Sequence, residues 1–211
     1  MLLTEQIKHD IETHKLLDYS PYPKQKEFHN AGSAFRERLF CGGNRVGKTE
    51  CGAAEMAMHL TGDYPKWWEG KRFVKPVRAW AAGITGESTR DVVQTKLLGP
   101  ADRRESWGTG MIPATALGDI MTGRGIANAI DMLTVKHVTG GYSSLAFKSY
   151  EKGREKWQGA ALEVIWMDEE CDIEIYTEAL TRTNETKGIV FMTCTPLLGM
   201  SEVMRRFWMP E

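Results

Sequence analysis

One glycine-rich stretch dominates the sequence: Cys41-Gly42-Gly43-Asn44-Arg45-Val46-Gly47-Lys48-Thr49, which from Gly42 onward has the pattern G-x-x-x-x-G-K-T. This pattern is typical of a phosphate-binding loop. Gly42 and Gly47 allow backbone angles closed to residues with a side chain, so consecutive N–H groups can surround a phosphate. We expect Lys48 to reach the β- and γ-phosphate oxygens and the Thr49 hydroxyl to bind Mg²⁺. The residues expected to bind the nucleotide here are Gly42, Gly43, Asn44, Arg45, Val46, Gly47, Lys48 and Thr49.

A phosphate-binding loop needs a strand before it and a helix after it, and the sequence predicts both. Residues 38–41 are mainly apolar and lead into glycines, which predicts a short strand. Residues 51–60 carry small and apolar residues at helical spacing, and the segment 61–65, T-G-D-Y-P, ends the helix. The alternative is a glycine-rich turn that matches the pattern by chance.

The composition limits what the whole chain can do. Its 211 residues suffice for one domain with a full core. The 27 Lys and Arg balance 28 Asp and Glu, so the net charge of −1 predicts no overall attraction to nucleic acid or anionic membranes. The 4 cysteines are far apart and lack C-x-x-C pairing, which favours reduced thiols in a cytoplasmic protein. The N-terminus lacks the apolar centre of a signal peptide.

The N-terminal segment is predicted to add two features. Leu3, Ile7 and Ile11 recur at helical spacing, which predicts an amphipathic helix over residues 2–17 that docks on the core. Residues 21–29, P-Y-P-K-Q-K-E-F-H, are predicted to be extended and then helical. This segment is either a linker or an adenine site. In the second case Gln25 bonds the adenine edge through its donor and its acceptor, and a tyrosine ring stacks on the base.

The middle of the chain is less informative. Residues 66–75 mix cations with aromatics, as in a nucleic-acid surface, but their lack of periodicity favours an exposed connection anchored by its tryptophans. Residues 77–84 predict a core strand and residues 89–98 a helix. Residues 100–131, rich in Gly, Pro and mixed charge, predict no definite element. Two apolar runs, 135–138 and 145–147, predict a hairpin around T-G-G-Y-S.

Three acids after an apolar run predict the other half of the nucleotide site. Residues 162–167 are mostly apolar, and Asp168, Glu169 and Glu170 follow. A strand inside a parallel sheet delivers such carboxylates at its carboxyl edge, beside the phosphate-binding loop. We expect Asp168 to hold Mg²⁺ and Glu169 to orient and polarise the attacking water. Glu170 takes that role only if the strand ends one residue later. A carboxylate that aligns water favours a hydrolase over a kinase.

The last predicted strand ends in two hydroxyl groups. Residues 173–183 predict a helix, and residues 188–196 predict a core strand that carries Thr193 and Thr195 at its end. The two threonines are either ordinary strand formers or sensors. As sensors they would hydrogen-bond the γ-phosphate or the catalytic glutamate and report hydrolysis to the rest of the protein.

Taken in order, these elements resemble the N-terminal ATPase domain of the large terminase subunit, the DNA-packaging motor of tailed bacteriophages. The matching segments are 23–25 (P-K-Q), 42–49, 164–169 and 193–196 (T-C-T-P), and together they cover most of the chain. Many ATPases and helicases share the loop and the acid pair. The upstream glutamine and the T-C-T-P strand are what point to terminases.

The resemblance implies that the residues named above keep their expected roles, with Gln25 near adenine and residues 193–195 as a coupling motif. Terminases usually carry an arginine four residues before the loop lysine, but here Asn44 stands there and Arg45 follows it. Ring motors often take a catalytic arginine from the neighbouring subunit. Arg154 is our first candidate for this arginine finger and Arg124 the second, and a solvated surface charge is the alternative for both.

The resemblance also implies partners and a place of action. The partners are double-stranded DNA, neighbouring copies in a ring on the procapsid portal, and the small terminase subunit, with no membrane. The place is the host cytoplasm during virion assembly. Complete large terminases carry a second, RNase H-like nuclease domain, and this sequence stops at Glu211, so we expect no nuclease activity. We expect one domain over residues 1–211, with an N-terminal helix and adenine segment (1–34), an ATPase core (35–200) and a tail (201–211) that holds a terminal helix near 202–208.

The sequence therefore predicts an α/β fold of the P-loop NTPase type, in which helices flank a mainly parallel sheet in three layers. The predicted function is Mg²⁺-dependent ATP hydrolysis that moves viral double-stranded DNA into a procapsid. One alternative is a helicase-like nucleic-acid translocase, although that class needs a second lobe with its own arginine finger. The other is a nucleotide-binding assembly module with little turnover, and Glu169 argues against it.

Overall fold

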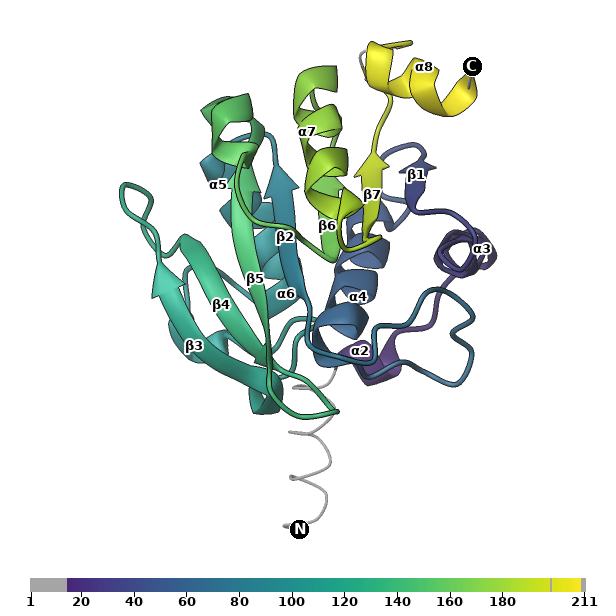
Figure 1. The fold of residues 1–211 in the computed structure, drawn as a ribbon. Coiled ribbons are helices and arrows are strands. Elements are labelled where there is room, and N and C mark those ends of the chain that lie inside the picture. The colour runs from purple at the N-terminus through teal and green to yellow at the C-terminus, as the bar shows by residue number, and fades with distance from the viewer. Residues whose placement is uncertain (1–14, 198, 210–211) are drawn as a thin grey trace.

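The computed structural model describes residues 15–197 and 199–209 and is built around a seven-stranded sheet (Figure 1). The strands lie in the order β1-β7-β6-β2-β5-β4-β3. The first five are parallel to their neighbours, and β4 and β3 are antiparallel additions at one end. The strands are β1 (Glu37–Cys41), β2 (Arg78–Gly83), β3 (Leu117–Thr122), β4 (Ile130–Lys136), β5 (Tyr142–Ser149), β6 (Val164–Asp168) and β7 (Ile189–Cys194).

Helices cover both faces of the parallel part of the sheet, so the predicted three-layer α/β fold with a mainly parallel sheet is confirmed (Figure 1). The α-helices are α2 (Lys15–Asp18), α3 (Pro23–Ala31), α4 (Lys48–Thr61), α5 (Gly86–Ser88), α6 (Thr95–Leu98), α7 (Ile173–Asn184) and α8 (Glu202–Trp208). A π-helical stretch, Thr89–Gln94, joins α5 to α6. None of the described helices is long and apolar enough to cross a membrane.

Helix α4 packs closely on the sheet because several buried residues of the helix are small. Ala53, Ala54 and Ala57 are fully buried. A Cβ on Gly52 would lie only 2.4 Å from the indole Nε1 of Trp166 in β6, so only glycine fits there. The helix begins after Gly47 and ends at Gly62, both with positive φ, and the Gly62 N–H donates to a carbonyl of the last turn. This packing fixes the start of α4 directly beside the ends of the central strands.

The opposite face of the sheet carries a second core under α7 and the loop that follows β5. This loop contains two 3₁₀ turns, η4 (Tyr150–Lys152) and η5 (Arg154–Trp157). The Trp157 side chain is fully buried, and its ring lies edge-on to that of Trp80 with centroids 5.6 Å apart. The loop between β5 and β6 is therefore anchored to the core by an aromatic side chain.

A buried polar cluster joins α3, β1 and α4 beneath the phosphate-binding loop. Glu55 in α4 is fully buried and forms an ion pair with Arg38 of β1. Its carboxylate also accepts hydrogen bonds from His29 Nδ1 at 2.7 Å and from His59 Nε2 at 3.3 Å. Burial alone would raise the pKa of Glu55, but Arg38 and the two histidines hold it well below its usual range. We call Arg38, Glu55, His29 and His59 the Glu55 cluster.

Most predicted elements are present. The strands predicted at 38–41, 77–84, 162–167 and 188–196 are β1, β2, β6 and β7, and the predicted hairpin is β4 and β5. The segment 21–29, predicted to be extended and then helical, leads into α3, and helices are also found where residues 51–60, 89–98, 173–183 and 202–208 predicted them. Strand β3 lies in the region 100–131, for which no element was predicted. Its six residues include a glycine and an aspartate and are all half-exposed or exposed, so they lack the apolar pattern of a core strand.

Two predictions concern the start of the described chain and the connection after α4. The helix expected over residues 2–17 lies mostly outside the described residues, and its described end is α2. Residues 66–75 form the anchored connection that was favoured over a nucleic-acid surface. Trp68 is 3% exposed and packs against the rings of His29 and His59. The tryptophans of this segment therefore pack in or against the hydrophobic core.

Candidate nucleotide site

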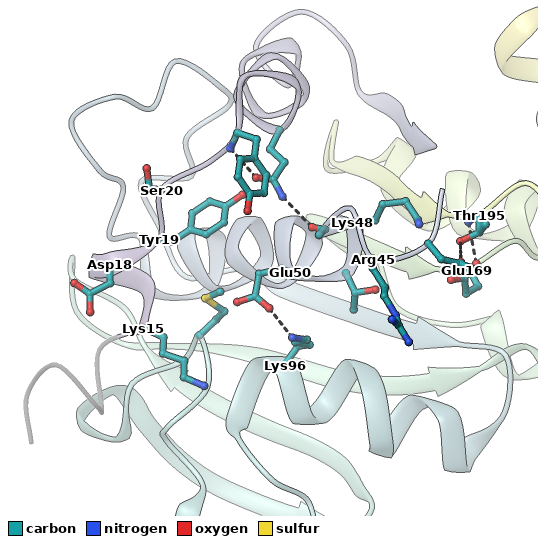
Figure 2. Close-up of a pocket in the computed structure, with 16 residues that line it drawn as sticks. Lys15, Asp18, Tyr19, Ser20, Arg45, Lys48, Glu50, Lys96, Glu169 and Thr195 are labelled. Carbon is teal, nitrogen blue, oxygen red and sulfur yellow. Dashed lines mark hydrogen bonds and ion pairs between the residues drawn. The ribbon is translucent and has the colours of Figure 1, made fainter. Parts of the chain in front are cut away.

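The carboxyl ends of β1, β7 and β6 lie side by side, and each leads into one of the predicted motifs (Figure 1). The phosphate-binding loop follows β1, the acid pair ends β6, and the two threonines end β7. A cavity of about 610 Å³ opens where this edge meets the segment that contains α2 and α3 (Figure 2). Its lining residues are Lys15, Asp18, Tyr19, Ser20, Tyr22, Gln25, Asn44, Arg45, Gly47, Lys48, Thr49, Glu50, Lys96, Met111, Glu169 and Thr195.

Of the two loop glycines expected to adopt backbone angles closed to other residues, Gly47 has a positive φ and Gly42 does not. Gly47 has φ 76° and Arg45 has φ 63°, so two residues of the loop adopt the left-handed conformation. A Cβ at Gly47 would also approach Gln25 Nε2 to 2.9 Å. The Lys48 ammonium donates to the carbonyl oxygen of Gly43 at 2.6 Å, across the mouth of the loop. Lysine and helix N-terminus thus face the place where an anion would sit.

The Asp168 carboxylate accepts hydrogen bonds from two hydroxyl groups, those of Thr49 and Thr193. The Thr49 hydroxyl donates to the Asp168 carboxylate at 3.1 Å, and the fully buried Thr193 hydroxyl donates to it at 2.7 Å. Thr193 in turn accepts from the indole N–H of Trp166 at 2.8 Å. Burial raises the pKa of Asp168 to about 6. Such a buried carboxylate beside a hydroxyl, without a basic side chain bonded to it among the described residues, fits a hard divalent cation such as Mg²⁺.

Glu169 faces the cavity in a strained backbone conformation. It has φ 65° although it is not a glycine, and it directly follows the last residue of β6. Its N–H donates to the Thr193 carbonyl at 2.7 Å, and its carboxylate accepts the Thr195 N–H at 3.0 Å. The Thr195 hydroxyl then donates to the Asn44 side chain in the phosphate-binding loop at 3.2 Å. The last two bonds connect the acid, Thr195 just after β7 and the phosphate-binding loop, and Figure 2 shows Glu169 beside Thr195.

Gln25 closes the other end of the cavity, where adenine was expected. Its Nε2 donates to the Gly47 carbonyl at 2.9 Å, and its Oε1 accepts the Tyr22 N–H at 2.8 Å. One N–H and one lone pair of the amide remain for a ligand. The Tyr22 ring is 67% exposed and lines the cavity, so it can stack on a base. Gln25 therefore joins the α3 segment to the loop as well as facing the cavity.

The structure brings most of the predicted site residues together. Those that line the cavity are Gln25, Asn44, Arg45, Gly47, Lys48, Thr49, Glu169 and Thr195. Thr193 and Asp168 lie just below its floor, and Gly42, Gly43 and Val46 belong to the loop without lining the cavity. Glu170 lines a different hollow.

Both candidate finger arginines lie away from the cavity lining. Arg154 in η5 is more than half exposed, and its Nε donates to Glu178 of α7 at 3.2 Å. Glu178 also pairs with Arg182 at 3.0 Å. Arg124 is exposed in the turn between β3 and β4. Either arginine would have to act on the cavity of another copy.

Three residues near the site were not predicted from the sequence. Tyr19 forms part of the wall, and its hydroxyl lies 3.0 Å from His29 Nε2 of the Glu55 cluster. Lys96 of α6 reaches the cavity and forms a 2.7 Å ion pair with Glu50, the residue after Thr49. Tyr150 bonds the backbone of the acid pair. Each depends on a contact with a residue ten or more positions away in the sequence, which local patterns do not reveal.

Comparisons with known proteins agree with the geometry. Residues 39–211 match the family model described as terminase large subunit, T4likevirus-type, N-terminal. The large terminase subunit of Salmonella phage P22 is 40% identical over 222 residues, which cover 97% of this chain and 44% of that protein. The chain thus spans less than half the length of this relative.

Solved structures show the same fold. The large terminase of a thermophilic bacteriophage, in complex with ADP, superimposes with a TM-score of 0.54 at 17% identity, over 82% of this chain and 39% of that chain. A second crystal form of the same thermophilic phage terminase gives a TM-score of 0.54 at 16% identity, over 83% of this chain and 39% of that chain.

Proposed function

Because the chain belongs to the large terminase family, in the part described as T4-like and N-terminal, we propose that it binds MgATP in this cavity and hydrolyses it to drive double-stranded DNA into a procapsid. The observation that carries the proposal is the 3.1 Å contact of Thr49 with Asp168, beside the cavity-lining Lys48 and Glu169. A loop for phosphates, a carboxylate for the metal and a carboxylate for water lie at one sheet edge. The ADP bound by the thermophilic phage terminase supports a nucleotide as ligand.

The chain's own groups account for the steps of hydrolysis. Lys48 leaves the Gly43 carbonyl and bonds the β- and γ-phosphates, and the N–H groups of the loop surround them. Glu169 holds a water in line with the γ-phosphate and polarises it, because water is a poor nucleophile unless it is aligned. The Thr195 N–H fixes the carboxylate for this task.

Thr49 and Asp168 would hold Mg²⁺, the first through its hydroxyl and the second directly or through water. When bound, the metal would neutralise negative charge on the phosphates. Burial raises the pKa of Asp168 to about 6, and a cation beside the carboxylate would stabilise its charged form and offset the cost of burial.

The adenine end of the site is proposed to involve Gln25 and Tyr22. The free N–H and lone pair of Gln25 match the donor and acceptor of the adenine edge, and the exposed Tyr22 ring offers a stacking surface. Replacing Gln25 with Ala should reduce the preference for ATP over GTP. An unchanged preference would remove Gln25 from base recognition.

In the assembled motor we propose a ring of copies at the procapsid portal, working with the small terminase subunit in the host cytoplasm. Arg154 is proposed to reach the γ-phosphate bound by a neighbouring copy, with Arg124 as the second candidate. More than half of the Arg154 side chain is exposed, and its partner Glu178, which is buried, keeps its ion pair with Arg182 when Arg154 leaves.

The first test is the rate of ATP hydrolysis per subunit over a wide range of protein concentration, with Lys48→Ala as the blank. Glu169→Gln should bind ATP and lose turnover, because the amide cannot accept a proton from water. A rate per subunit that climbs with concentration and falls in Arg154→Ala indicates a site completed by a neighbour.

Two outcomes would change the proposal. ATP binding without turnover at any concentration would favour a nucleotide-binding assembly module. A rate that is independent of concentration, and equal in Arg154→Ala, would mean that each chain is catalytically complete.

A further inference from the structure

Tyr150 contacts the backbone of the acid pair from outside the nucleotide cavity. It is the first residue after β5, and its hydroxyl lies 2.9 Å from the Asp168 carbonyl oxygen and 3.1 Å from the Glu169 carbonyl oxygen. The side chain is 8% exposed. Carbonyl oxygens only accept hydrogen bonds, so the phenol must act as the donor to both.

The contact falls at the one strained residue of the acid pair. Glu169 has φ 65°, in the left-handed region that residues with a side chain rarely adopt. Such a conformation persists only when the surroundings determine it. Thr193 and Thr195 bond Glu169 from the side of β7, and Tyr150 bonds it from the side of β5. Tyr150 thus contacts Glu169 from the end of β5, whereas the two threonines contact it from the end of β7.

Tyr150 is also the first residue of the loop that carries Arg154. The Gly153 N–H donates to the Tyr150 carbonyl at 2.9 Å, and the Trp157 ring lies 6.0 Å from the Tyr150 ring. Arg154, between them, is tied to Glu178 of α7. The buried Trp157 and Tyr150 side chains give the loop 150–157 two anchors, and one of them, Tyr150, bonds the acid pair.

We propose that Tyr150 is a positioning residue for Glu169 and that, through it, the loop 150–157 controls hydrolysis within its own subunit. This inference rests on the proposed ATPase function. A neighbouring copy that engages Arg154 would release it from Glu178 and shift the loop. Tyr150 would carry that shift to the Glu169 carbonyl, and the carboxylate that holds the water would move with it. The loop then links contact between subunits to the acid that activates water.

The test compares Tyr150→Phe with a matched control, Tyr176→Phe. Tyr176 is fully buried on the same side of the sheet, and its hydroxyl bonds Glu37 at 3.1 Å, at the far end of β1 from the nucleotide site. Both variants lose one buried phenol hydroxyl. Tyr150→Phe should lower kcat by about 10- to 100-fold, since a small misplacement of a reacting group has effects of this order. Its Kd for ATP should stay within about twofold of wild type, because Lys48 and Thr49 are untouched.

Three results would overturn the proposal. The first is a kcat within about twofold of wild type in Tyr150→Phe. The second is an equal fall of kcat in Tyr176→Phe, which would indicate general loosening of the fold. The third is a loss of ATP affinity that accounts for the whole loss of activity.

A measurement that does not need turnover separates this proposal from the proposed function. In ¹⁵N-labelled protein, the amide resonances of Glu169 and Thr195 should shift in Tyr150→Phe and stay in place in Tyr176→Phe, because the Thr195 N–H bonds the Glu169 carboxylate. If wild type hydrolyses no ATP, the proposed function fails, and these resonances still decide the role of Tyr150. Unmoved Glu169 and Thr195 amides in Tyr150→Phe would refute it.

Discussion

Replacing Glu55 with Gln should destabilise the fold far more than any exposed charge would. Glu55 is fully buried, and Arg38, which faces it, is 5% exposed. The substitution keeps the shape but removes the negative charge opposite Arg38 and replaces one of its two carboxylate acceptors with an NH₂ donor. The Arg38 guanidinium then keeps the amide oxygen and the Phe28 carbonyl, at 2.9 Å, as neutral acceptors. An amide group also cannot accept from His29 and His59 on both sides. Removing one partner of a buried ion pair costs about 3–5 kcal/mol, which is a large part of the roughly 5–15 kcal/mol typical of a whole domain.

Urea unfolding at pH 7 measures this loss. With a slope of about 2 kcal/mol per molar urea, the midpoint of Glu55→Gln should fall by about 2 M. The matched control is Glu50→Gln in the same helix, since Glu50 pairs with Lys96 at 2.7 Å but both side chains are more than a third exposed. That pair should contribute less than about 1 kcal/mol.

A double variant separates charge from packing. Arg38→Met with Glu55→Leu removes both charges and should recover much of the loss, because no uncompensated charge is left in the core. The low pKa of Glu55 means that its stabilisation is present above about pH 4.5 and disappears as the pH falls through the folded value, so Glu55→Gln should flatten the acid limb of stability against pH. Equal and small losses in Glu55→Gln and Glu50→Gln would refute the reasoning.

Three further predictions concern the floor of the site. Gly52→Ala should destabilise by about 1–3 kcal/mol despite the better helix propensity of alanine, since its Cβ would lie 2.4 Å from Trp166 Nε1; a gain in thermal stability would contradict this. Thr193→Val leaves the Trp166 N–H without its acceptor, so the free energy of unfolding measured in urea should fall by about 1–3 kcal/mol. A fall below about 0.5 kcal/mol, the usual effect of a surface substitution, would contradict this. The pKa of Asp168 is raised from 3.8 to about 6, so its charge destabilises the metal-free protein above pH 6 and not below pH 4. Asp168→Asn should therefore raise the free energy of unfolding by about 2–3 kcal/mol at pH 8 and leave it unchanged near pH 4, and equal effects at both pH values would argue against it.

The parts of the site that could be predicted are those whose chemistry is contiguous in sequence. The loop from Gly42 to Thr49 needs glycines, a lysine and a hydroxyl at fixed spacing, and a buried strand followed by two acids is also a local pattern. The carboxyl ends of parallel strands share one sheet edge, so the meeting of the two motifs follows from the fold class. This is why Lys48, Thr49, Asp168 and Glu169 could be placed together from their local patterns.

The parts that could not be predicted depend on which elements pack together. Arg38 lies in a short apolar strand, where its charge gives no hint of the buried Glu55 in the middle of α4. Lys96 reaches the cavity because the π-helical stretch and α6 pack beside α4. The Tyr150 contact requires the end of β5 to lie near the end of β6, although β2 separates the two strands in the sheet. None of these contacts has a local spacing that identifies it.

The bond from the Lys48 ammonium to the Gly43 carbonyl has a consequence for how the site responds to substrate. The Gly43 carbonyl already accepts a hydrogen bond from the Lys48 ammonium. An incoming nucleotide must displace this carbonyl, which belongs to the same loop and therefore always stays near the lysine. A hydrogen bond to a charged group contributes about 1.5–3 kcal/mol, equivalent to roughly a 10- to 150-fold reduction in apparent affinity. Weak ligands such as free phosphate would fail to open the loop, whereas a triphosphate that offers several bonds at once can do so. The resting contact therefore acts as a threshold that favours the full substrate over its fragments.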